Sequence, residues 1–152
     1  MLTFEPESQD QQERLGARLA ECFPTASLIV YLKGDLGAGK TTLVRGFLRG
    51  LGYTGTVKSP PYTLIEPYII GDKSIFHLDL YRLADADELE YLGVRDLLQQ
   101  DSVLLIEWPE RGEGVLPAAD LTILIHHREH GREVRVSGQS VAGEFAIHNL
   151  AP

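Results

Sequence analysis

The architecture of this chain follows from one segment, Gly34-Asp35-Leu36-Gly37-Ala38-Gly39-Lys40-Thr41. We call it the glycine loop, because it matches the pattern G-x-x-x-x-G-K-[ST] at every fixed position. Glycines allow backbone N–H groups to turn inward around phosphate oxygens, and a helix that begins at the end of the loop adds the positive end of its dipole. The segment therefore predicts a site for a nucleoside triphosphate with Mg²⁺.

The residues on both sides of the glycine loop provide the context that this pattern requires. Residues 28–32 form a continuous apolar run, which is typical of a strand buried on both faces in a parallel sheet. After the loop, a helix is expected to run until Gly50 and Gly52. Its apolar residues recur with helical spacing at Leu43, Val44, Phe47, Leu48 and Leu51.

Further strands and helices are expected around this unit. Ser8 and Gln11 have the spacing of a capping box, so they predict a helix over residues 9–23. Val103 to Ile106 is a second fully apolar run and predicts a second central strand. The other expected elements are strands over 62–70 and 74–81 with a hairpin turn at 71–73, short helices over 85–92 and 95–99, and alternating C-terminal strands at 121–125, 134–136 and 141–148.

Together these elements predict an α/β fold. We expect a three-layer sandwich like that of P-loop nucleoside triphosphatases, with a largely parallel central sheet. A β-hairpin is inserted after the loop helix, and antiparallel C-terminal strands complete the sheet. The chain has 152 residues, of which 43% are hydrophobic, and it shows no internal repeat or linker. It is therefore expected to form a single domain over residues 1–152.

Composition restricts the location and the partners of the protein. No stretch approaches the roughly 18 to 20 apolar residues of a membrane helix, and the acidic N-terminus lacks the features of a signal peptide, so a cytoplasmic protein without membrane contact is expected. The formal net charge of −8 argues against a protein that mainly holds nucleic acid, because such binding needs clustered Lys and Arg. Any contact with nucleic acid is expected to be indirect.

The chemistry is expected from the end of the glycine loop and from two carboxylates. Lys40 is expected to reach the β and γ phosphates, and the Thr41 hydroxyl to bind Mg²⁺. Glu107 and Asp79 each follow an apolar strand, where open α/β sheets place their ligands. We assign Glu107 to the metal, directly or through water, and Asp79 to orienting a metal-bound or attacking water. The predicted catalytic residues are thus Lys40, Asp79 and Glu107, and the predicted phosphate-binding residues are Gly37, Ala38, Gly39, Lys40, Thr41 and Thr42.

Two further regions are open to more than one interpretation. Residues 58–63 lie between the loop helix and the hairpin, where phosphate-loop proteins often keep a segment that senses the γ phosphate. Ser59 and Thr63 fit that role, and equally fit a turn and a strand. Trp108 follows Glu107 directly and is either a docking or base-side residue or a half-buried aromatic at a strand end. His77 lies inside a strand pattern and receives no functional assignment.

The chain also resembles a known family, the bacterial ATPase TsaE, also called YjeE. Four blocks carry the resemblance, and they span the middle half of the chain in the same order. The blocks are Gly34 to Leu43, then Ser59-Pro60-Pro61-Tyr62-Thr63-Leu64, His77-Leu78-Asp79-Leu80-Tyr81-Arg82-Leu83 and Ile106-Glu107-Trp108-Pro109-Glu110. The resemblance implies a single α/β domain that binds ATP and Mg²⁺ and hydrolyses ATP weakly. It also implies association with the TsaB and TsaD proteins, which modify adenosine 37 of tRNAs reading codons that begin with A.

For the site, the resemblance implies that Thr41 and Glu107 hold Mg²⁺ and that Asp79 and the segment around Ser59 matter for hydrolysis. It further implies a functional role for the region of Trp108. An arginine of the C-terminal hairpin is expected to touch the nucleotide, and Arg132 is the candidate.

Position 61 departs from the family pattern, which reads Ser-Pro-Thr-Tyr-Thr. Pro61 stands where the threonine is expected, and proline offers neither a hydroxyl nor an N–H. It also restricts Pro60 to extended geometry. If that threonine senses the γ phosphate or supports the metal, this chain is impaired in hydrolysis but still binds ATP.

Three alternatives to a tRNA-modification ATPase remain at this point. A small-molecule kinase would need an arginine-rich lid, whereas the inserted element is a hairpin. A nucleotide-gated binding module with little hydrolysis is compatible with Pro61. A GTPase is disfavoured, because guanine-reading chains commonly carry an Asn-Lys-x-Asp motif and the single asparagine here is Asn149.

Overall fold

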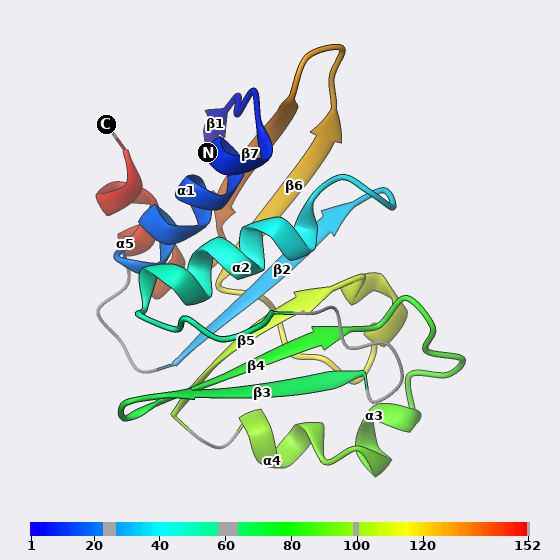
Figure 1. Ribbon diagram of the computed structural model, residues 1–152. Helices are drawn as coiled ribbons and strands as arrows, with labels where there is room; N and C mark the ends of the chain where they lie inside the picture. The colour runs from blue at the N-terminus through cyan, green and yellow to red at the C-terminus, as the bar shows by residue number, and fades with distance from the viewer. Residues whose placement is uncertain (23–26, 58–63, 99–100, 152) are drawn as a thin grey trace.

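A mixed seven-stranded sheet forms the centre of the computed structural model, which describes residues 1–22, 27–57, 64–98 and 101–151. The strand order is β1-β7-β6-β2-β5-β4-β3 (Figure 1). The strands are β1 (Leu2–Phe4), β2 (Leu28–Gly34), β3 (Ile65–Ile70), β4 (Lys73–Asp79), β5 (Ser102–Glu107), β6 (Leu121–His127) and β7 (Arg132–Gly138). The helices are α1 (Gln9–Ala20), α2 (Lys40–Gly50), α3 (Glu88–Tyr91), α4 (Val94–Leu98) and α5 (Val141–Leu150), with a 3₁₀ turn η1 (Pro109–Gly112).

The middle of the sheet is parallel and its edges are antiparallel. Strands β6, β2, β5 and β4 run parallel, whereas β7 and β1 on one side and β3 on the other pair antiparallel. All six residues of β5 are buried, and they include the apolar run Val103 to Ile106 that predicted this strand. The α/β class is thus confirmed, and so are the two central strands.

Helices cover the sheet on both faces. Along β5 the side chains alternate, so that Val103 and Leu105 join the core under α1, α2 and α5, whereas Leu104 and Ile106 join the core under α3 and α4. Figure 1 shows α1, α2 and α5 grouped on one side and α3 and α4 apart from them. Within the described residues, no helix has the length and apolar character needed to cross a membrane.

The C-terminal segment corrects the sequence prediction. Residues 141–148 were expected to form a strand, but they belong to helix α5. Ser140 starts this helix, because its hydroxyl accepts a hydrogen bond from the N–H of Gly143 at 3.0 Å. Ala146 and Leu150, four residues apart, then face the core. The N-terminal strand β1, which the sequence did not suggest, pairs with β7 at the edge of the sheet.

Smaller differences concern the ends of elements. Helix α1 begins at the capping residue Ser8 as predicted, and it ends at Ala20. The helix expected over residues 85–92 is shortened to α3, because the Asp85 carboxylate accepts from the N–H of Asp87 at 3.0 Å and forms a turn before the helix. Residues 62 and 63 of the expected strand lie outside the described residues, and the observed strand β3 begins at Ile65.

Glycines bring α1 and α2 into close contact. A Cβ atom on Gly46 would lie 1.9 Å from the carbonyl oxygen of Glu13, and one on Gly16 would lie 2.2 Å from that of Leu43. Contacts this short with backbone atoms leave no room for a methyl group. The pairing of the two helices therefore depends on these glycines.

Gly46→Ala is expected to reduce the free energy of unfolding by about 1–3 kcal/mol, because the helices must separate to admit the methyl group. Urea denaturation followed by circular dichroism measures the effect. The matched control is Arg45→Ala on the next residue of α2, where the loss of a 3.9 Å ion pair with Glu13 is expected to change stability by about 0.5 kcal/mol or less. If the two substitutions lowered the free energy of unfolding equally, Gly46 would not be needed for the close contact of the helices.

Candidate functional site

The glycine loop leaves the carboxyl end of β2 at Gly34 and enters α2 at Lys40. Gly37 and Gly39 have φ angles of 78° and 101°, in the left-handed region that favours glycine. A side chain on Gly39 would also collide with the Gln12 amide, since its Cβ would lie 2.3 Å from Nε2. The backbone conformation thus explains why glycine stands at both positions, of which Gly39 is a fixed position of the pattern.

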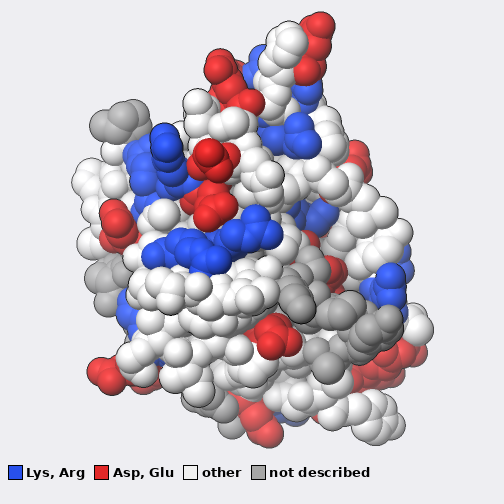
Figure 2. All heavy atoms as spheres, in the orientation of Figure 1, with Lys and Arg blue, Asp and Glu red and all other residues white. Residues whose placement is uncertain are grey.

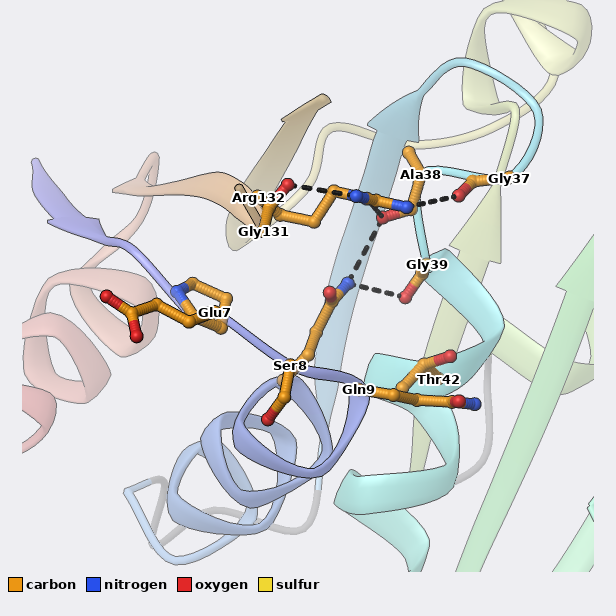
Figure 3. Close-up of a pocket in the computed structure, with 11 residues that line it drawn as sticks. Glu7, Ser8, Gln9, Gly37, Ala38, Gly39, Thr42, Gly131 and Arg132 are labelled. Carbon is orange, nitrogen blue, oxygen red and sulfur yellow. Dashed lines mark hydrogen bonds between the residues drawn. The ribbon is translucent and has the colours of Figure 1, made fainter. Parts of the chain in front are cut away.

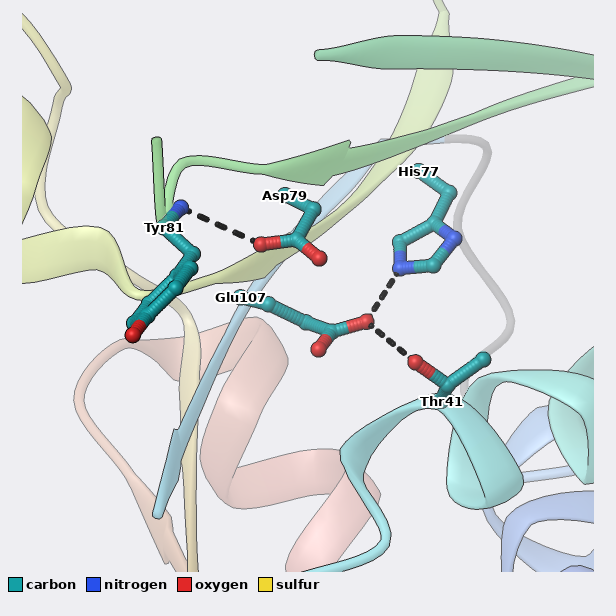
Figure 4. Close-up of polar contacts among 5 residues, drawn as sticks. All are labelled: Thr41, His77, Asp79, Tyr81 and Glu107. Atoms are coloured by element: carbon teal, nitrogen blue, oxygen red, sulfur yellow. Dashed lines mark hydrogen bonds and ion pairs between the residues drawn. The ribbon is translucent and has the colours of Figure 1, made fainter. Parts of the chain in front are cut away.

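A pocket of about 320 Å³ opens on one side of the loop. It is lined by loop residues, by the strand-end carboxylates Asp79 and Glu107, and by the rings of Tyr81 and Trp108. The Thr41 hydroxyl donates to Oε2 of Glu107 at 3.0 Å (Figure 4). The two residues predicted to hold a metal therefore meet, although 66 positions separate them.

The two carboxylates are neighbours because of strand register. Asp79 pairs with Glu107 at the parallel ends of β4 and β5, and Figure 4 shows both side chains on the side of Thr41. One Asp79 oxygen accepts from the N–H of Tyr81 at 3.1 Å. Burial, and secondly the charge of Glu107, raise the pKa of Asp79 above its ordinary value. A cation placed between the two carboxylates would relieve this repulsion.

His77 is a site residue that the sequence interpretation missed. It is fully buried, and its Nε2 lies 2.5 Å from Oε2 of Glu107. His77 lies two residues before Asp79 on β4, so both side chains point to the same face of the sheet. This two-residue spacing from a candidate carboxylate was the signal available in the sequence. Nδ1 of His77 has no hydrogen-bond partner among the described residues.

Lys40 is held at the base of the same pocket. Its Nζ donates to the carbonyl oxygens of Gly34 and Asp35, the latter at 3.0 Å, and lies 4.2 Å from the centre of the Trp108 ring. Burial lowers the pKa of Lys40, while nearby carboxylates, Glu107 foremost, oppose that shift. Trp108 itself has a left-handed backbone with φ of 57°. The structure thus brings Trp108 directly onto the lysine of the glycine loop.

A second pocket, of about 380 Å³, lies on the other side of the loop (Figure 3). Arg132 borders it from the start of β7. Its Nε donates to the carbonyl oxygen of Ala38 at 3.1 Å, and its Nη2 to that of Gly37 at 3.3 Å. Residues 6–9 and Gln12 of the N-terminal segment form the opposite wall. Arg132 is therefore at the loop, as its assignment required, and Gln12 is a further neighbour that the sequence did not suggest.

Ser59, Pro61 and Thr63 lie outside the described residues. The two arginines of α2 are engaged elsewhere: Arg45 lies 3.9 Å from the Glu13 carboxylate, and Arg49 donates to the carbonyl oxygens of Tyr53 and Gly55. Figure 2 shows Lys and Arg side chains interspersed with Asp and Glu on the face it presents.

Fold and site together define an α/β protein in which a central parallel strand runs through a glycine loop into a helix, beside two strand-end carboxylates. The family model of "Threonylcarbamoyl adenosine biosynthesis protein TsaE" matches residues 6–134. The chain belongs to the TsaE family, which takes part in the biosynthesis of threonylcarbamoyladenosine in tRNA.

Individual relatives agree with this assignment. The tRNA threonylcarbamoyladenosine biosynthesis protein TsaE of Haemophilus influenzae is 49% identical over 138 residues, covering 88% of this chain and 87% of the relative. The protein of the same name from Bacillus subtilis is 41% identical, covering 72% and 68%. The crystal structure of Bacillus subtilis YdiB superimposes with a TM-score of 0.82 at 29% identity, covering 98% of this chain and 93% of that one.

Proposed function

We propose that this chain is a Mg²⁺-dependent ATPase of the P-loop class that supports threonylcarbamoyl modification of adenosine 37 in tRNAs reading codons that begin with A. In this proposal it acts on a complex of TsaB and TsaD. The observation that carries the proposal is the 3.0 Å contact between the Thr41 hydroxyl and the Glu107 carboxylate, at the point where the glycine loop becomes α2.

The donor set fits magnesium. Mg²⁺ prefers oxygen ligands and is commonly held in phosphate-loop proteins by a loop hydroxyl and a strand-end carboxylate. Thr41 and Glu107 supply that pair, and Asp79 beside them orients a water. When bound, the cation would neutralise charge on the phosphates and on the buried carboxylates.

The nucleotide is proposed to lie along the loop between the two pockets. Both pockets share Gly37, Ala38, Gly39 and Thr42, so a ligand that follows the loop passes from one to the other. The terminal phosphates belong beside Lys40 and the metal pair, and the nucleoside belongs on the side of Arg132. Lys40 leaves the carbonyl oxygens of the loop and turns to the β and γ phosphates, where it stabilises negative charge.

Contact with tRNA is proposed to be indirect. The net charge of −8 disfavours binding to a phosphate backbone, and on the face that Figure 2 presents acidic side chains lie among the basic ones. TsaB and TsaD would then carry the tRNA, while this chain supplies the nucleotide cycle. We assign the coupling of the nucleotide to a partner to Trp108, a residue of the pocket whose ring centre lies 5.0 Å from that of Tyr81.

Deletion of the gene tests this function directly. The modified nucleoside should disappear from bulk tRNA and return when the unaltered chain is expressed, whereas normal levels after deletion would refute the proposal. Turnover with and without TsaB and TsaD, for this chain and for Pro61→Thr, separates an ATPase from a binding module with little hydrolysis. Phosphate transfer to a metabolite faster than to water would instead indicate a small-molecule kinase.

His77→Phe is expected to weaken Mg²⁺ binding in the ATP complex by about 10–100-fold, because it removes the buried group that orients Glu107. ATP affinity in EDTA should change little. His77→Gln, which places an N–H at a similar reach, should recover part of the Mg²⁺ affinity. A titration of hydrolysis against Mg²⁺ concentration measures the effect, and identical midpoints for His77→Phe and the unaltered chain would exclude a positioning role.

Asp79→Asn is expected to make the ligand-free chain more stable at pH 7. Burial and Glu107 raise the pKa of Asp79, so the folded chain favours the protonated carboxyl and loses stability as pH rises from 3.8 through the folded pKa. Asparagine does not ionise, so the variant does not lose this stability as the pH rises. Thermal unfolding in EDTA should therefore give a higher Tm for Asp79→Asn at pH 7 and converging values near pH 3.8. If the Tm difference between Asp79→Asn and the unaltered chain stayed constant over this pH range, the raised pKa of Asp79 would be contradicted.

A further inference from the structure

The carbonyl oxygens of the glycine loop are held by side chains from both ends of the chain. Gln12 of α1 donates from Nε2 to Gly39 O at 2.9 Å and to Ala38 O at 3.3 Å. Arg132 of β7 holds Ala38 O and Gly37 O from the same pocket. Figure 3 draws these bonds to three consecutive carbonyls, and a further one from Arg132 to the carbonyl oxygen of its neighbour Gly131.

We propose that Gln12 is a positioning residue that sets the glycine loop in its anion-binding conformation before any ligand arrives. The proposal rests on the function above, in which the loop binds the phosphates of ATP. It adds a residue that lies 27 positions before Gly39 and outside the G-x-x-x-x-G-K-[ST] pattern.

Peptide geometry connects the carbonyls to the phosphate site. In a trans peptide the C=O and the N–H of one unit point in opposite directions. Gln12 fixes the two units that join Ala38 to Gly39 and Gly39 to Lys40, so the N–H groups of Gly39 and Lys40 point away from Gln12. These are N–H groups that an anion at the start of α2 would use.

The position of Gln12 is itself determined by packing. Gln12 is 4% exposed, and a buried amide is costly unless it is hydrogen-bonded. The close contact of α1 with α2 at Gly16 and Gly46 brings Gln12 under the loop. Gly39 completes the fit, because any side chain there would occupy the space of the Gln12 amide. The Gln12 amide and the loop carbonyls therefore find each other as hydrogen-bond partners only in this conformation.

A prearranged loop has a kinetic signature. Without Gln12 the two peptide units rotate more freely, and only the fraction of molecules with inward N–H groups accepts the ligand. The association rate falls in proportion to that fraction, while the dissociation rate, which reflects the bound state, stays the same. A residue that contacts the ligand would instead raise the dissociation rate, and a purely structural residue would change neither.

Stopped-flow binding of a fluorescent ATP analogue with Mg²⁺ tests the proposal on the full chain. Gln12→Leu should lower the association rate about tenfold, as expected for losing two neutral hydrogen bonds, with little change in dissociation. Competition by inorganic triphosphate should weaken by the same factor, because that probe has no base or ribose. Gln12→Met repeats the test with a side chain of matching length in case leucine prevents folding.

Asn149→Leu is the matched control. Asn149 also donates a side-chain amide to a backbone carbonyl, that of Cys22 at 3.1 Å, but far from the loop. It should lower the urea midpoint and leave both rates unchanged. Unchanged association for both Gln12 variants, or faster dissociation alone, would overturn the positioning role. Failure of the unaltered chain to bind the analogue would instead refute the proposed function.

Discussion

Glu107→Gln is expected to lower Mg²⁺-dependent ATP hydrolysis by about 100-fold or more, because the proposed Mg²⁺ would lose its charged protein ligand. Glu107 is 3% exposed and its carboxylate contacts both Thr41 and His77. An amide of the same size keeps the packing but removes the negative charge. The measurement is phosphate release as a function of Mg²⁺ concentration, together with ATP binding in EDTA.

The pattern of the result distinguishes metal binding from general damage. Glu107→Gln should retain its ATP affinity in EDTA. Its rate of phosphate release should no longer increase when Mg²⁺ is added. Glu113→Gln, the same change at an exposed position beyond η1, should behave as the unaltered chain. Hydrolysis by Glu107→Gln at the normal Mg²⁺ dependence would remove Glu107 from the metal site.

Lys40→Met should reduce ATP affinity by about 100-fold or more. Hydrogen bonds from an ammonium to phosphate oxygens are worth about 1.5–3 kcal/mol each, and the three N–H donors of Lys40 allow more than one in the proposed complex. Methionine retains an apolar side chain of similar length and removes the ammonium group that lies over the Trp108 ring. Isothermal titration with ATP and Mg²⁺ measures the loss.

Stability measurements separate this loss from unfolding. Burial lowers the pKa of Lys40, so the folded chain holds its charge at a cost, and Lys40→Met should unfold at a temperature no lower than the unaltered chain. Lys33→Met, on an exposed residue of β2, is the matched control and should leave ATP affinity intact. Normal affinity in Lys40→Met would show that the loop binds its ligand without this lysine.

Elements with a strong local signal could be predicted from the sequence. Strands β2 and β5 are apolar runs of the kind that a doubly covered parallel sheet requires, and Ser8 caps α1. The prediction was wrong for α5, because apolar residues alternate with others over residues 141–148 and were interpreted as a strand. There the Ser140 cap and the burial of Ala146 and Leu150 against the sheet favour a helix.

The sequence by itself determined the glycine loop, because left-handed φ angles at Gly37 and Gly39 are a property of the residues themselves. It also placed Asp79 and Glu107 at strand ends, which is a property of each strand alone. Only the tertiary structure decided that β4 and β5 pair in the register that joins them, that His77 reaches Glu107 and that Gln12 reaches the loop. These contacts join segments about 30 residues apart, and their geometry depends on sheet register and on the distance between α1 and α2, which no local pattern encodes.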